Sequence, residues 1–257
     1  MPQPIPASDP VGLEFPPFPA TGRVFRATRR VRLGDVTPRG RLRLDAAVRY
    51  LQDIAHDDAR EAAYADRDGW VVRRTAVRVH QFPVFQEPLT LHTWCSGLGS
   101  HWAERETLIE GERGGRIEAV AVWVHVDLST MAPSKLASDF IEVAGPSAGG
   151  RKVGARVVLR ERPIPDNRRH PWPLRFSDMD ALGHMNNAAY WEAVEEWLAS
   201  HRELRAPLDA VIEHLNPIHA EHEVATVVRE YPDFTMIWHE SAGVIAAATQ
   251  IAASRIS

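Results

Sequence analysis

Residues 175–190 read RFSDMDALGHMNNAAY, and a related stretch lies earlier in the chain. That earlier stretch starts at Val31 and reads VRLGDVTPRGRLRLDAAVRYLQDIA. When it is aligned without gaps to the segment that starts at Leu174, four pairs of residues are identical: Arg32 and Arg175, Asp35 and Asp178, Gly40 and Gly183, and Ala46 and Ala189. Further on, VHQFPVFQE from Val79 aligns with EHLNPIHAE from Glu213 and gives the pairs His80 and His214, Pro83 and Pro217, and Glu87 and Glu221. These matches keep their order and nearly their spacing, which predicts an internal duplication.

Each copy has the pattern of a helix followed by strands. Apolar residues recur at helical spacing from Leu44, where Asp45 can cap, and from Tyr190, where Asn186 or Asn187 can cap. The strand-like runs after the first helix are WVVRRTAVRVHQF, LTLHTWC, WAERETLIE and RIEAVAVWVHVDL; those after the second are LDAVIEHL, EVATVVREY, FTMIWHE and GVIAAATQIAA.

One strand, a buried helix and further strands, repeated, predict an α+β protein in which antiparallel sheet curls around each helix. We expect a proline-rich arm over residues 1–22, a first domain over 23–144, a linker rich in Gly and Pro over 145–170, and a second domain over 171–257. The tryptophans of the first copy, Trp70, Trp94, Trp102 and Trp123, are expected in the core.

Composition narrows the class of protein. The net charge of -4 gives no indication of nucleic-acid binding, and no apolar run reaches the length of a membrane span. The N-terminus lacks the basic start and apolar core of a secretory signal, and the lone Cys95 excludes an intramolecular disulfide. We therefore expect a cytoplasmic protein. Arginines crowd residues 23–43, which suits either an acidic partner or a solvated strand face.

The two copies differ at positions that can carry chemistry. Asp180 lies opposite Thr37, His184 opposite Arg41, Asn187 opposite Leu44, and His219 opposite Phe85. Polar and titratable side chains thus gather in the second copy. We expect a site that is kept there and lost in the first copy, which would then serve as packing partner and pocket wall.

Asp180 and His184 flank a turn just before a helix, a placement that suits hydrolysis of a carbonyl compound. Unpaired N–H groups at a helix start can stabilise an oxyanion, while a carboxylate activates water or attacks and a histidine donates or orients. The alternative interpretation is structural: the Asp180 side chain only closes an Asx turn, and Asn186 or Asn187 only caps the helix. His214, His219 and His222 share no obvious face, so we expect neither a metal nor a cofactor.

The segment RFSDMDALGHMNNAAYWEAVEE resembles the D-x-D-x-x-G-H-x-N-N-x-x-Y signature of hotdog-fold thioesterases. YLQDIA, WVVRR, EPLTLHTW and AVWVHVDL resemble the N-terminal half of the acyl-acyl-carrier-protein (acyl-ACP) thioesterases of plants and bacteria. The resemblance implies two tandem hotdog domains that release fatty acids from acyl-ACP. It places the family's catalytic aspartate on Asp180 and its histidine on His184. The family's usual asparagine falls on Leu182, and its later Glu-Cys pair falls on Ile218 and His219.

From these residues we expect Asp180 as nucleophile or general base, His184 and His219 as positioning groups, and Asn187 as a group that polarises the carbonyl. The carrier is acyl carrier protein or CoA, because the GHMNN form of the motif also resembles that of CoA-type hotdog enzymes. A hotdog dehydratase and a non-catalytic acyl-binding protein are the alternatives. A homodimer also stays open, since the two copies can complete a pseudo-dimer within one chain.

Overall fold

The computed structural model describes residues 11–62, 69–202 and 204–254. Its long helices are α1 (Leu44–Glu61) and α3 (Tyr190–Ser200), and α2 (Ser138–Ala144) is short. The strands are β1 (Phe25–Arg30), β2 (Gly69–Gln81), β3 (Pro88–Leu98), β4 (Trp102–Gly111), β5 (Arg116–Val126), β6 (Arg169–Pro171), β7 (Leu208–His214), β8 (Val224–Glu230), β9 (Thr235–Ser241) and β10 (Val244–Ala253). Each strand predicted from the sequence is present, with ends that differ by one or a few residues.

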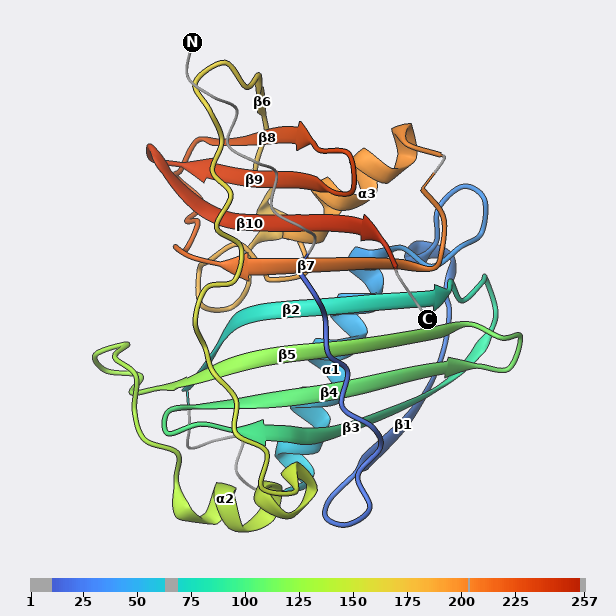
Figure 1. The fold of residues 1–257 in the computed structure, drawn as a ribbon, viewed down its shortest axis with the longest axis vertical. Coiled ribbons are helices and arrows are strands. Elements are labelled where there is room, and N and C mark those ends of the chain that lie inside the picture. Colours follow the sequence, from blue (N-terminus) through green and yellow to red (C-terminus); the bar gives the residue numbers. More distant parts are fainter. Residues whose placement is uncertain (1–10, 63–68, 203, 255–257) are drawn as a thin grey trace.

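The strands form one antiparallel sheet whose order is symmetric about its middle (Figure 1). From one edge the order is β1-β3-β4-β5-β2, and it continues as β7-β10-β9-β8-β6. Each strand of the first half therefore has a counterpart in the second at the same distance from the centre. The halves join where β2 pairs with β7, with Ala76 opposite Val211. This arrangement confirms the α+β class and the pair of tandem hotdog units.

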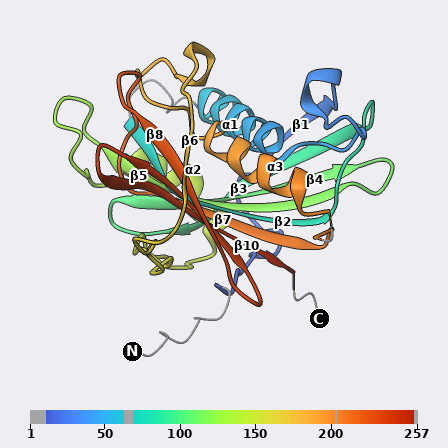
Figure 2. The same cartoon turned by 90° about the horizontal axis from the view of Figure 1, so that it is seen from above.

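Helices α1 and α3 lie side by side on one face of the sheet (Figure 2). The inward face of α1 is apolar and buried, including Leu44, Val48, Leu51 and Ile54. In α3 the Trp191 and Val194 side chains are fully buried. The apolar residues that recur at helical spacing in the sequence thus face the sheet in both copies, and burial of their apolar surface holds the helices there.

The opposite face of the sheet is covered by chain segments without helices (Figure 1). Phe18 of the N-terminal arm packs on His92 and Trp94, with ring centroids 5.5 and 5.0 Å apart. The segment after α2 crosses the same face, where the Val158 and Leu159 N–H groups donate to the buried Glu213 carboxylate. Residues 1–10 of the predicted arm lie outside the described part of the chain.

One local expectation is wrong. Asp45 does not cap α1, because its buried carboxylate forms ion pairs with Arg43 and Arg49. The sequence analysis assigned no element to the stretch after residue 137, which forms α2. Among the described helices, none has the length and hydrophobicity needed to span a bilayer.

Candidate active site

The Asp180 turn is closed by the aspartate itself. The Asp180 N–H donates to the His184 carbonyl at 2.8 Å, and the Gly183 N–H donates to the Asp180 carbonyl at 3.0 Å. Gly183 has a φ of +77°, which only glycine adopts without strain. The Asp180 Oδ1 accepts from the Leu182 N–H at 2.8 Å and from the His184 N–H at 3.3 Å. Asp180 therefore forms the Asx turn anticipated from the sequence, and its second carboxylate oxygen, Oδ2, forms no hydrogen bond among the described residues.

The first copy builds the same turn with different side chains. There the Thr37 N–H donates to the Arg41 carbonyl at 2.8 Å, and Gly40 has a φ of +82°. The chain leaves both turns alike: the Arg43 N–H donates to the Asp35 carbonyl, and the Asn186 N–H donates to the Asp178 carbonyl. The structure thus matches Asp180 with Thr37, His184 with Arg41 and Asn187 with Leu44, as the ungapped alignment predicts.

His219 lies next to His184. The two residues form an antiparallel bridge, and their rings meet edge to face with centroids 4.7 Å apart. His222 continues the cluster at 5.1 Å from His219, and its Nδ1 accepts the His219 N–H at 3.3 Å. The structure therefore brings Asp180, His184 and His219 together.

The counterpart of His219 in the first copy is Val84, not Phe85. Arg41 bridges Val84 as His184 bridges His219. The Val84 N–H donates to the Glu87 side chain as the His219 N–H donates to His222. The sequence alignment of this segment is therefore shifted by one residue, because identical prolines and histidines fixed it while the backbone pairing follows a different register.

Tyr190 lies behind the turn in a buried aromatic cluster. Its ring contacts His214 and His239 with centroids 4.8 and 5.1 Å apart. Burial raises the pKa of Tyr190, and the charge of Asp180 adds to that rise. Burial lowers the pKa of His214 to about 3 and that of His239 to about 4. These two histidines are neutral at physiological pH, unlike a group that must exchange protons there.

His214 does not join His219 and His222, because it packs on Tyr190. In the parts of the chain that the structure describes, no group of three or more His, Cys, Asp or Glu side chains is arranged to hold a metal ion.

Asn186 and Asn187 connect the turn to a large cavity. The Asn186 side chain accepts the Ala188 N–H at 2.9 Å and so caps the turn that precedes α3. Asn187 borders a cavity of about 680 Å³ between α1 and the first half of the sheet, a volume typical of small-molecule sites. Its other lining residues are Arg29, Gln52, Asp53, Ala55, His56, Asp57, Ala59, Trp70, Cys95, Ala103, Glu104, Arg105, Trp123, Phe140 and Asn186.

This lining corrects one expectation and adds residues that the sequence did not single out. Trp70 and Trp123, expected in the core, border the cavity. Gln52 lies on α1 and lines the cavity together with Asn187. The lining includes neither Asp180, His184 nor His219, so Asn187 is the predicted site residue that reaches the cavity itself. Burial raises the pKa of the Cys95 thiol to about 11, which makes it a poor nucleophile.

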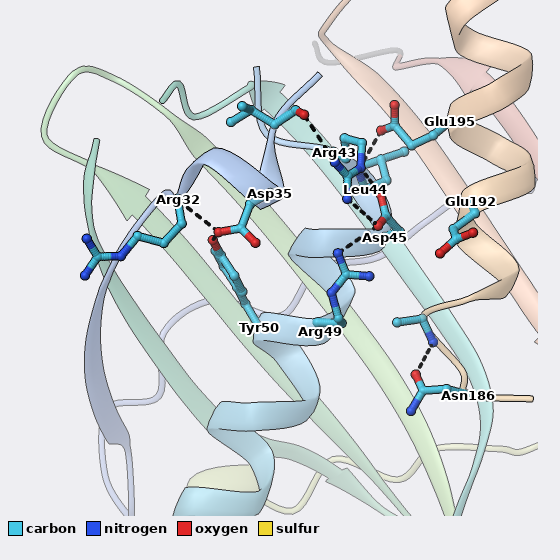
Figure 3. Close-up of polar contacts among 12 residues, drawn as sticks. Arg32, Asp35, Arg43, Leu44, Asp45, Arg49, Tyr50, Asn186, Glu192 and Glu195 are labelled. Atoms are coloured by element: carbon cyan, nitrogen blue, oxygen red, sulfur yellow. Dashed lines mark hydrogen bonds and ion pairs between the residues drawn. The ribbon is translucent and has the colours of Figure 1, made fainter. Parts of the chain in front are cut away.

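The equivalent place in the first copy is filled by an ion pair. Glu195 of α3 accepts the Leu44 N–H at 2.6 Å (Figure 3). The same carboxylate pairs with both terminal nitrogens of Arg41 at 3.0 and 2.9 Å. The Glu195 side chain is 8% exposed. A carboxylate from the opposite helix thus binds the first N–H of α1, where helix ends favour negative charge. The first copy has neither the aspartate nor the histidine of the second, and its helix start is occupied.

Two hotdog units joined through one sheet, with a polar turn before the second helix, define the class of tandem hotdog enzymes. Residues 22–144 match the family model of the acyl-ACP thioesterase N-terminal domain, and residues 161–255 match that of the C-terminal domain. The chain belongs to the acyl-ACP thioesterase family and is a thiolester hydrolase.

Relatives and solved structures agree with this assignment. An uncharacterized protein of Mycobacterium tuberculosis is 31% identical over 216 residues, which is 84% of this chain and 86% of that protein. A chloroplastic acyl-ACP hydrolase of Cuphea viscosissima is 24% identical over 66% of this chain, but over only 46% of its own length. The 12:0-ACP thioesterase of Umbellularia californica has the same fold, with a TM-score of 0.74 at 18% identity over 91% of this chain and 98% of that one. An acyl-ACP thioesterase of Bacteroides thetaiotaomicron also has this fold, with a TM-score of 0.75 at 16% identity over 89% of this chain and 97% of that one.

Proposed function

We propose that this protein hydrolyses fatty acyl-ACP at the Asp180 turn and releases a free fatty acid and the carrier thiol. The observation that carries the proposal is the position of this turn. It precedes α3, and Asn187, which lies between the turn and the helix, borders a cavity large enough for an acyl chain. The acyl chain would lie between α1 and the sheet of the first copy, while the thioester would lie at the start of α3.

Hydrolysis at this place needs a base, an oxyanion donor and a leaving thiolate. Water adds to the carbonyl carbon as its proton passes to the Asp180 carboxylate, and the C=O electron pair moves onto the oxygen. The Asn187 N–H stabilises that oxyanion. When the C=O bond re-forms, the C–S bond breaks and the thiolate leaves with its electron pair, to be protonated by Asp180 or by His184. A thiolate leaves readily, so one weak acid is sufficient.

Leu182 and His219 give this site its own character. The Leu182 side chain is 66% exposed, and only its N–H contacts Asp180. The role of the asparagine that the family usually has there thus does not pass to Leu182. His219 contacts His184 directly, and we assign it the role of holding the His184 ring toward the thioester.

The arginine-rich segment contributes less to carrier binding than its sequence indicates. Arg23, Arg29, Arg41 and Arg43 are used in ion pairs with Asp58, Asp53, Glu195 and Asp45. The guanidinium groups of Arg26, Arg32 and Arg39 form no ion pair with a carboxylate among the described residues, and their positive charge suits an acidic carrier protein.

Release of free thiol from C8 to C18 acyl-ACP and acyl-CoA tests the function. We expect turnover with acyl-ACP, and a kcat/KM that falls as salt rises because charge steers the carrier. A higher kcat/KM with acyl-CoA at every chain length would instead identify CoA as the carrier. Tight binding of acyl ligands without turnover would identify an acyl-binding protein. Loss of water from a 3-hydroxyacyl thioester would identify a dehydratase.

The cytoplasmic location, the assembly into homodimers and the domain boundaries stay predictions. Size-exclusion chromatography with light scattering would decide between a monomer and a dimer.

A further inference from the structure

The pseudo-symmetry of the molecule relates the closed place in the first copy to the open one in the second. The ungapped alignment that matches Leu44 with Asn187 also places Gln52 of α1 opposite Glu195 of α3. Leu44, the first residue of α1, contacts Glu195 from the middle of α3. Asn187 lies in the turn just before α3, and the pseudo-symmetry places Gln52, from the middle of α1, opposite it.

The contacts and the cavity lining support this reciprocal arrangement. Glu195 reaches the Leu44 N–H directly at 2.6 Å (Figure 3). Gln52 and Asn187 together line the large cavity, and they also line a small cavity of about 20 Å³ deeper under α1. The Asn187 N–H has no acceptor among the described residues, whereas the equivalent Leu44 N–H is bound to a carboxylate oxygen.

The two places differ in charge in a way that suits catalysis. In the first copy the glutamate supplies an anion of its own, and Arg41 neutralises it. In the second copy the glutamine is neutral and carries N–H donors, and His184 stands in the place of Arg41. A substrate oxygen that gains negative charge can bind there without meeting a carboxylate from the opposite helix.

We propose that the Glu195 carboxylate oxygen in the first copy marks the position that the thioester oxygen takes in the second copy. The donors to that oxygen are then the Asn187 N–H and the side-chain amide of Gln52. Gln52 becomes a catalytic residue contributed by the first copy, which is therefore more than a wall of the acyl cavity. This assignment rests on the proposed hydrolysis and names a residue that acts in it.

Steady-state kinetics of Gln52→Ala and Gln52→Glu test the assignment with the best acyl-ACP of the panel. Loss of one oxyanion donor lowers kcat about 10²-fold, and KM changes by less than about 3-fold. Gln52→Glu lowers kcat further, because its carboxylate occupies and repels the oxyanion. Gln81→Ala, at an exposed strand end away from the site, is the matched control and keeps the wild-type kcat. A Gln52→Ala variant that retains kcat, or changes KM alone, overturns the assignment.

Binding of dodecanoate separates failure of this assignment from failure of the proposed function. The carboxylate of this fatty acid places an oxygen at the same donors without any turnover. We expect the affinity to fall about 10-fold in Gln52→Ala and more in Gln52→Glu, with 1-dodecanol binding unchanged in Gln52→Ala. If dodecanoate binding depends on Gln52 but the protein hydrolyses no thioester, the assignment of the oxygen-binding site stands and the proposed hydrolysis is wrong. Equal affinity in all variants would reject the oxygen site. Circular dichroism establishes that each variant is folded.

Discussion

His184 and His219 meet edge to face, with ring centroids 4.7 Å apart, and their backbones form an antiparallel bridge. The contact joins the turn before α3 to the segment after β7, so two separate parts of the second copy hold one imidazole in place. In the first copy the same backbone bridge joins Arg41 to Val84, which cannot exchange protons. The change of side chains on a shared backbone is what distinguishes the two copies.

Removal of the His219 ring should impair catalysis without unfolding the protein. In His219→Ala the His184 ring loses its aromatic contact and its fixed orientation, and we expect kcat to fall about 10²-fold, the low end of what acid–base groups contribute. His170→Ala, an exposed histidine on β6, is the control. Thiol release measures both variants, and equal kcat values would show that His219 has no part in the reaction.

The cavity beside α1 should determine which acyl chains fit. Ala59 lines it, so Ala59→Phe fills part of the space and shortens the preferred chain. We expect kcat/KM for C16 substrates to fall at least about 10-fold and kcat/KM for C8 substrates to change less than about 3-fold. The added ring takes up part of the cavity, and the longest acyl chains are excluded first.

Ala199→Phe, an exposed alanine of α3, is the matched control for this experiment. It should leave the chain-length profile unchanged. An identical profile in Ala59→Phe would mean that the acyl chain binds elsewhere.

Glu106 should make the stability of the protein depend on pH. It is 1% exposed, and burial together with the charges of Glu118 and Glu104 raises its pKa to about 9. The unfolded chain ionises this group near its model value of 4.5, so its contribution to stability is complete below that pH and is lost as pH rises toward 9. The free energy of unfolding should fall by at most about 1.4 kcal/mol per pH unit from this group.

Glu106→Gln cannot ionise, so it should gain stability relative to wild type between pH 5 and pH 8.5. Urea unfolding at both pH values measures the difference, with the exposed Glu110→Gln on the same strand as control. If the stability difference between Glu106→Gln and wild type is the same at both pH values, Glu106 is ionised in the folded protein throughout that range.

The fold was predictable because its signals are local. The apolar stripe from Leu44 and the strand-like run over residues 116–128 specify a helix and a strand from local sequence alone, and the repeat specifies that both occur twice. Helix α2 and the Glu195 cap were not predictable. The α2 segment has no strong apolar stripe, and the cap joins α1 to a residue far away in the sequence.

The residues of the Asp180 turn could be predicted from the sequence, whereas most residues that line the cavity could not. Asp180, His184 and Asn187 could be found because the two copies differ there on one backbone. Trp70 and Gln52 could not, because an aromatic ring or an amide has the same local pattern whether it packs in a core or borders a cavity. The shift of the second alignment by one residue arose for a similar reason: side-chain identity, rather than backbone pairing, had set the match.

The most direct test of the account is thiol release from acyl-ACP by wild type and Asp180→Asn, with dodecanoate binding measured on the same preparations. The amide keeps the size of the side chain and an oxygen that can accept the Leu182 N–H, so the turn and the acyl cavity should persist. We predict that kcat falls about 10³-fold while dodecanoate affinity changes less than about 3-fold. An Asp180→Asn variant that retains wild-type turnover would contradict the assignment of Asp180 as the catalytic carboxylate.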